Sequence, residues 1–124
     1  MEEQRRAPRM EEQDYATVTV ISAPEVPALE RKTFTCLTRD VSVSGLQFVA
    51  FVGPPIGAIL HLHVAVLRPV RAFNHIARVV WTKHSADATY SIGVEFTDTQ
   101  GEAWAAWKTH VMQVLGSDAR LSRE

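Results

Sequence analysis

The sequence predicts a mainly β protein, a closed antiparallel barrel of six strands that is followed by one helix. Two observations lead to this prediction. Six stretches alternate apolar and polar residues with the period of two that strands show, and short links without a helical pattern join them. A further stretch near the C-terminus spaces its large apolar residues as a helix does. A closed barrel is favoured because it leaves no strand edge exposed.

The predicted strands occupy most of the sequence before the helix. Their ranges are 16–21, 32–38, 45–51, 58–66, 72–82 and 89–96. In each strand, residues two positions apart are expected to face the same side of the sheet. On this basis Val79 and Trp81 are expected on one common side of the fifth strand. The links contain turn residues, such as the Gly53-Pro54-Pro55 segment.

The predicted helix has an apolar stripe that is expected to pack against the barrel or against a partner. Five large apolar residues fall at offsets of 0, 3, 7, 10 and 11, and these are Trp104, Trp107, Val111, Val114 and Leu115. Asp98 or Thr99 is expected to cap the helix, and Gly116 is expected to end it. Packing is favoured because aromatic stripes more often belong to a core than to a binding site.

These patterns divide the chain into three parts. Residues 1–14 hold three arginines and five acidic residues without a hydrophobic cluster, so this leader is expected to be flexible in isolation. Residues 15–116 form the predicted barrel and helix, and residues 117–124 form a predicted tail. A chain of 124 residues that is 46% hydrophobic has the size and composition of one domain with one core.

Charge, hydropathy and cysteine content narrow the possible functions. The net charge of -1 argues against a protein that binds nucleic-acid polymers through non-specific phosphate contacts. The N-terminus lacks the apolar stretch of a secretory signal, and the apolar runs are too short or interrupted to span a membrane. We therefore expect a cytoplasmic protein without membrane insertion. Cys36, the one cysteine, lies in a predicted strand and is expected to be a buried apolar side chain.

The leader carries a cluster of arginines, Arg5-Arg6-Ala7-Pro8-Arg9. Pro8 disfavours helix at the residue before it, so an extended or loop conformation is expected. The guanidinium group suits an anionic nucleotide, because its planar fork pairs with phosphate or with the O6 and N7 edge of guanine. Taken alone, the cluster is more typical of a solvated charged tail than of a binding site.

A second polar segment, Asp40-Val41-Ser42-Val43-Ser44-Gly45, lies between two predicted strands. A carboxylate accepts hydrogen bonds from the N1 and N2 edge of guanine, a hydroxyl donates or accepts, and glycine permits close approach to the backbone. Taken alone, the segment is more typical of an ordinary turn, in which Asp and Ser bind local amides, than of a binding pocket.

In combination the two segments are more specific. Arg5-x-x-x-Arg9 followed by Asp40-x-Ser42-x-x-Gly45, with a strand between them and a strand after them, resembles the PilZ domain family. Agreement extends along the chain, at Gly57, at Arg78-Val79-Val80-Trp81 and at Gly93-Val94-Glu95-Phe96. The resemblance implies a six-stranded antiparallel barrel with a C-terminal helix.

The resemblance also implies a ligand, the bacterial second messenger cyclic di-GMP, and a role for each matching residue. Arg5 and Arg9 form the main clamp on phosphates and guanines, with Arg6 in second rank. Asp40 and Ser42 bind the base, and Gly45 permits close packing at the pocket. Ser44 occupies a variable position and is a further candidate contact. No cofactor is expected, and the implied function is that of a receptor or adaptor that signals to a downstream protein.

Three alternatives remain open. A PilZ-like adaptor that binds proteins but no nucleotide has the same architecture. A barrel for single-stranded nucleic acid would interleave basic residues with exposed aromatic ones, which this sequence does not favour. An enzyme would need a reactive centre. The histidine pair His61 and His63 has a spacing that suits a metal, with His75 and Glu95 as possible neighbours, but solvent-facing histidines are the favoured interpretation.

Overall fold

The computed structural model describes residues 15–67 and 70–123. Six strands, a short 3-10 helix and one long α-helix follow one another along the chain. They are β1 (Tyr15–Ser22), η1 (Pro27–Leu29), β2 (Thr33–Val41), β3 (Gly45–Ala50), β4 (Ile59–Leu67), β5 (Val70–His84), β6 (Tyr90–Phe96) and α2 (Gly101–Arg123).

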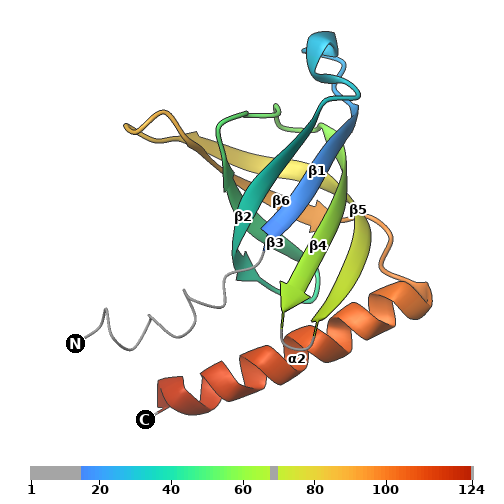
Figure 1. Ribbon diagram of the computed structural model, residues 1–124, viewed down its shortest axis with the longest axis vertical. Coiled ribbons are helices and arrows are strands. Elements are labelled where there is room, and N and C mark those ends of the chain that lie inside the picture. Colours follow the sequence, from blue (N-terminus) through green and yellow to red (C-terminus); the bar gives the residue numbers. More distant parts are fainter. Residues whose placement is uncertain (1–14, 68–69, 124) are drawn as a thin grey trace.

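The strands form a closed barrel, as the alternation of apolar residues predicts. Their order around the barrel is β1-β2-β3-β6-β5-β4, and every neighbouring pair is antiparallel. β1 pairs with β4 as well as with β2, so the sheet has no free edge. In Figure 1 the barrel stands above α2, which runs across one end of it beneath the ends of β4 and β5.

The core consists of the inward-facing residues of the strands. Alternate residues are buried along most strands, including Val18 and Val20 of β1, Leu46 and Phe48 of β3, Leu60, Leu62 and Val64 of β4, and Ile92 and Val94 of β6. Each such side chain contributes about 1.5–3 kcal/mol through burial. Cys36 belongs to this core, as predicted, and burial raises the pKa of its thiol to about 12.

The fifth strand differs from the prediction in one important respect. A register shift between Val79 and Trp81 marks a β-bulge at Val80. The bulge reverses the alternation, so Val79 is buried whereas Trp81 is 38% exposed. The prediction that these two side chains share one side of the strand is therefore wrong.

The helix begins later and ends later than predicted. It starts at Gly101, and the carboxylate of Asp98 instead accepts a hydrogen bond of 3.4 Å from the backbone N–H of Ile76. It passes through Gly116 and continues to Arg123. The expected end at Gly116 is wrong because a glycine inside a helix costs only about 1 kcal/mol and does not by itself stop it.

The tryptophan face of α2 packs on the barrel, as predicted. Trp107 is 1% exposed, and its ring meets those of Phe73, His75 and Phe96 edge-on at centroid distances of 5.2, 5.0 and 5.6 Å. Val111 is fully buried beside it. Edge-to-face contacts of this kind add to the stabilisation that comes from burial itself.

His75 is the polar member of this aromatic cluster. It stacks on Phe96 at a centroid distance of 4.1 Å, and its Nε2 atom is buried without a hydrogen-bond partner among the described residues. Burial lowers the pKa of His75, nearby His61 lowers it further, and Asp98 partly opposes this. His110, on the helix, also has a lowered pKa, because of its burial and the positive charge of Arg71.

Acidification is therefore expected to weaken the attachment of α2. The pKa of His75 in the folded chain lies below the ordinary histidine value of about 6.5, so below that pH the unfolded chain binds more protons than the folded chain; stability is therefore complete above that pH and declines as the pH falls. Each such histidine contributes at most about 1.4 kcal/mol per pH unit. Urea unfolding at pH 7 and pH 5 measures this decline, and it is expected to be smaller in His75→Phe. The exposed His63→Gln variant serves as control, and equal declines in His75→Phe and wild type would contradict the prediction.

None of the helices in the described ranges has the length and hydropathy of a membrane-spanning segment.

Candidate functional site

Ser42 organises the turn that joins β2 to β3. Its backbone N–H donates to the carbonyl oxygen of Gly45 over 2.8 Å. Its hydroxyl donates to the same carbonyl and accepts from the N–H of Gly45, both over 3.1 Å. A hydroxyl offers one donor and two acceptor positions. These bonds leave Ser42 with one acceptor position for a ligand.

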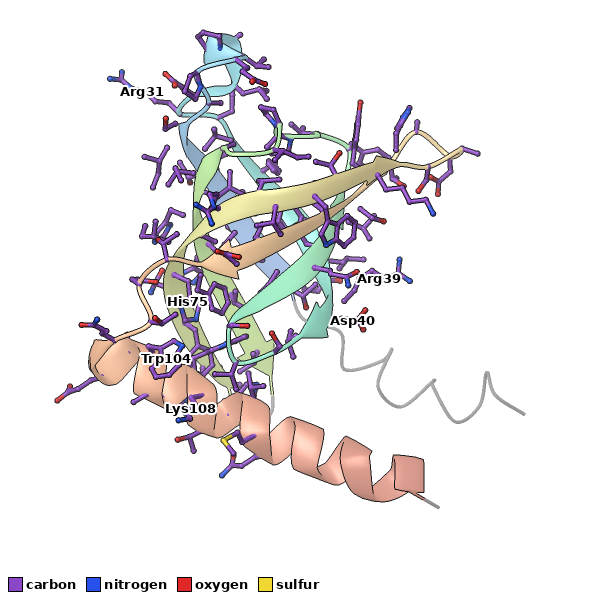
Figure 2. All side chains as sticks on the ribbon, turned by 180° about the vertical axis from the view of Figure 1, so that it is seen from behind. Arg31, Arg39, Asp40, His75, Trp104 and Lys108 are labelled. Atoms are coloured by element: carbon purple, nitrogen blue, oxygen red, sulfur yellow. The ribbon has the colours of Figure 1, made fainter. Side chains whose placement is uncertain are left out.

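Asp40 is displayed on the outer surface by a β-bulge. The register between β2 and β3 shifts between Thr38 and Val41, so Arg39 and Asp40 lie within the irregular part of the strand. A bulge re-aims side chains that regular pleating would send to opposite faces. Both Arg39 and Asp40 are exposed, and Figure 2 shows their side chains projecting from the barrel wall. The bulge thus places a carboxylate and a guanidinium group side by side, facing solvent.

Gly45 is fixed by contact between β3 and β6. It is buried and pairs with Glu95. A Cβ atom at this position would lie 2.2 Å from the carbonyl oxygen of Val94, which is a backbone atom of β6. The structure therefore gives Gly45 a packing role that the sequence did not reveal, and its predicted contact with a ligand stays a prediction. The neighbouring Ser44 is exposed, and its carbonyl accepts from the backbone N–H of Phe96 over 2.8 Å.

The same turn is bound from below by two tryptophans of α2. The indole N–H of Trp107 donates to the carbonyl oxygen of Ser42 over 3.0 Å. The indole N–H of Trp104 donates to the carbonyl oxygen of Val43 over 3.2 Å. These contacts were not expected from the sequence. Their only signal was that a buried indole needs an acceptor, which does not say where the acceptor lies.

A row of residues crosses the outer face of the barrel from this turn. Opposite the bulge in β2, Gln47 of β3 pairs with Gly93 of β6, which pairs in turn with Trp81 of β5. The indole of Trp81 covers Gly93, because a Cβ there would lie 2.1 Å from its Nε1 atom. The row from Asp40 to Trp81 spans three strand spacings, about 14 Å. Gln47 and the indole of Trp81 are the parts of this row that reach the surface.

The structure assembles only part of the predicted site. Asp40, Ser42, Ser44 and Gly45 lie together on one turn and the strand before it. Arg5, Arg6 and Arg9 lie outside the described residues. The sequence model of the PilZ domain matches residues 3–113, which is nearly the whole chain and includes both motifs. This chain belongs to the PilZ domain family.

The comparison with solved structures supports the PilZ fold. The chain is similar to the PilZ domain with c-di-GMP of YcgR from Escherichia coli, with a TM-score of 0.62 and 10% sequence identity. The similarity covers 90% of this chain and 88% of that chain. At this identity it shows a shared fold. The comparison with curated proteins gave no match.

A metal site is not found among the described residues of this PilZ domain. The described residues contain no group of three or more His, Cys, Asp or Glu side chains that could hold an ion. Of the side chains considered in the sequence, His75 lies in the core, His63 is exposed and hydrogen-bonded to Asn74 over 3.0 Å, and Glu95 is exposed. Glu95 forms an ion pair with Arg78 over 2.7 Å.

Proposed function

We propose that this PilZ domain is a receptor for cyclic di-GMP that signals to a downstream protein and catalyses no reaction. The observation that carries the proposal is the exposed Asp40 beside the ordered Ser42–Gly45 turn, in a chain that also contains Arg5-x-x-x-Arg9. We also propose a cytoplasmic location. The c-di-GMP in the similar YcgR domain supports this choice of ligand.

The geometry of the turn suits one edge of a guanine base. The ionised carboxylate of Asp40 only accepts hydrogen bonds, which fits the N1–H and N2–H donors of guanine. The acceptor position that the hydroxyl of Ser42 retains suits an N–H donor of guanine as well. Ser44 is exposed next to them and is proposed as a further contact. The partly exposed Gln47, opposite the bulge on β3, gives the plane of the base a surface on which to lie.

The arginines of the leader are proposed to bind the phosphates and the remaining edges of the bases. Tyr15, the first described residue, pairs with Leu37, three positions before Asp40 on β2. Arg9 lies six positions before Tyr15 in the sequence, a distance that an extended chain covers in about 20 Å. Arg5 and Arg9 are therefore within reach of a ligand at Asp40. Arg6 is proposed as an additional contact.

Binding is proposed to change the surface that the domain presents to its partner. The ligand supplies two phosphates and two bases, and residues 1–14 close over it. Ordering a segment of this kind costs about 2–5 kcal/mol, which charge-assisted hydrogen bonds and stacking offset. The closed segment and the ligand together form a surface that the free domain lacks.

Calorimetric titration with cyclic di-GMP tests the proposal. The variant Arg5→Ala/Arg9→Ala is expected to bind at least about 100-fold more weakly, because each hydrogen bond to a charged group contributes about 1.5–3 kcal/mol. Asp40→Ala is expected to lose about 10- to 100-fold for the same reason. Arg31→Ala is the matched control, since Arg31 is exposed at the opposite end of the barrel from Arg39 and Asp40 (Figure 2) and is expected to leave affinity unchanged.

Folded wild-type protein that gives no heat of binding and no spectral change with cyclic di-GMP would overturn the proposal. That result would favour the alternative of a PilZ adaptor that acts through protein contacts alone.

A further inference from the structure

The turn of residues 42–45, which is proposed to bind the ligand and is called the ligand turn below, is hydrogen-bonded to α2. Trp104 and Trp107 lie three residues apart, so their side chains project from the same face of the helix. Their indole N–H groups end on the carbonyl oxygens of two consecutive residues, Val43 and Ser42. These bonds join residues that are 61 and 65 positions apart in the sequence.

Each carbonyl group of residues 42–45 accepts a hydrogen bond, and for two of the four groups the donor lies on α2. The carbonyl of Gly45 is bound within the turn by Ser42, and that of Ser44 is bound by Phe96 of β6. The remaining two carbonyls, those of Ser42 and Val43, are bound by α2. Without the helix these two groups would lose their partners in the fold, and the turn would be held by β6 and its own hydrogen bonds alone.

The described contacts of α2 with the barrel come from the first three turns of the helix. Trp107 and Val111 are buried against the barrel, and Trp104 is half-buried with the ammonium group of Lys108 5.3 Å from the centre of its ring. Beyond these turns the helix extends past the barrel wall (Figure 1). Trp104 and Trp107 thus connect the ligand turn to an element that reaches outside the barrel.

We infer that Trp104 and Trp107 are positioning residues for the ligand turn, and that α2 reports whether this turn is occupied. The inference rests on the proposed function. When two sites are coupled, docking of α2 raises ligand affinity by the same factor by which ligand stabilises the docked helix. A ligand that fixes the turn therefore strengthens the attachment of α2, and a partner that binds α2 senses the ligand without touching it.

The first test removes the two indole N–H groups and keeps the aromatic rings. Trp104→Phe/Trp107→Phe is expected to bind cyclic di-GMP about tenfold more weakly than wild type, the loss expected from one or two hydrogen bonds. Val20→Ala is the control, since Val20 is a fully buried core residue whose carbonyl accepts from the N–H of Arg31, at the end of the barrel away from Asp40, and this variant is expected to bind within about twofold of wild type. Trp104→Phe alone, at a half-buried position, serves if the double variant does not fold.

The second test begins with the free protein and separates the positioning of the turn from the general stability of the fold. Amide hydrogen exchange of Ser42 and Gly45 in the free protein is expected to be faster in the phenylalanine variants, but not in Val20→Ala. In wild type, ligand is expected to slow exchange across residues 104–111. The chain has three tryptophans, so in Trp81→Phe only the two helix indoles emit, and ligand is expected to change that emission.

The outcomes distinguish this inference from the proposed function. If wild type and the phenylalanine variants bind equally, and exchange at the turn is unchanged, the positioning role is wrong while the receptor function stands. If wild type does not bind, the receptor function is wrong and the coupling falls with it. Faster exchange in the variants with weaker binding and a ligand-dependent emission change would support the inference.

Discussion

Trp107→Ala is expected to lower the free energy of unfolding by about 3–5 kcal/mol, the cost of removing a large buried aromatic side chain from a packed core. Trp107 is 1% exposed and fills the space between Phe73, His75 and Phe96. Its removal also leaves the carbonyl of Ser42 without its donor. Since a domain of this size has only about 5–15 kcal/mol of stability, the loss is a large part of the total.

Urea unfolding followed by circular dichroism measures this loss. Trp81→Ala is the matched control, because Trp81 is 38% exposed and lies on the outside of the barrel, so its replacement is expected to cost clearly less. A loss below about 1.5 kcal/mol for Trp107→Ala would mean that α2 contributes little to the core. Stability is expected to decline less toward low pH in this variant than in wild type. Removing the indole opens His75 to solvent and returns its pKa toward the ordinary value.

Gly45→Ala is expected to have the second large effect, a loss of about 3 kcal/mol in the free energy of unfolding. A Cβ atom there meets the carbonyl oxygen of Val94 at 2.2 Å. That oxygen belongs to a strand paired with β3, so relief requires that β3 and β6 move apart and give up hydrogen bonds of the ladder. The turn that begins at Ser42 moves with them, and ligand affinity is expected to fall as well.

Gly57→Ala is an informative comparison for Gly45→Ala, and both are measured by urea unfolding. Gly57 has a φ of +93°, and a Cβ there would meet no atom within 4 Å. Its replacement is expected to cost only the about 1–2 kcal/mol of an unfavourable backbone conformation. If Gly45→Ala proved as stable as wild type, the close approach of β6 would be absent in solution.

The barrel was predictable because its inward faces alternate along each strand. Leu60, Leu62 and Val64 are buried together because residues two positions apart in a strand share one face, and the same holds for Leu46 and Phe48. The bulge at Val80 was not predictable, since it depends on the register with β6 and leaves no mark in the alternation that precedes it. The end of α2 was missed because glycine favours a helix end without enforcing one.

The residues proposed for the site could be named from the sequence, whereas the local structure that holds them could not be predicted from it. Asp40, Ser42 and Gly45 stand out because of their spacing, and the structure does bring them to one turn. The bulge that turns Asp40 outward and the carbonyl that requires Gly45 both depend on neighbouring strands. The bonds from Trp104 and Trp107 cross 61 and 65 positions, a separation at which local patterns carry no information.

The burial of Cys36 has a practical consequence for measuring motion in this protein. Thiol-reactive labels attack the thiolate, and a thiol whose pKa is about 12 holds almost none of it near neutral pH. Cys36 is the one cysteine of the chain and is 5% exposed, so a cysteine introduced at the surface would be the only site to take up a label. Spin labels or fluorophores can therefore be attached to the leader and to α2 in the otherwise native sequence, and the separation between them followed as ligand is added.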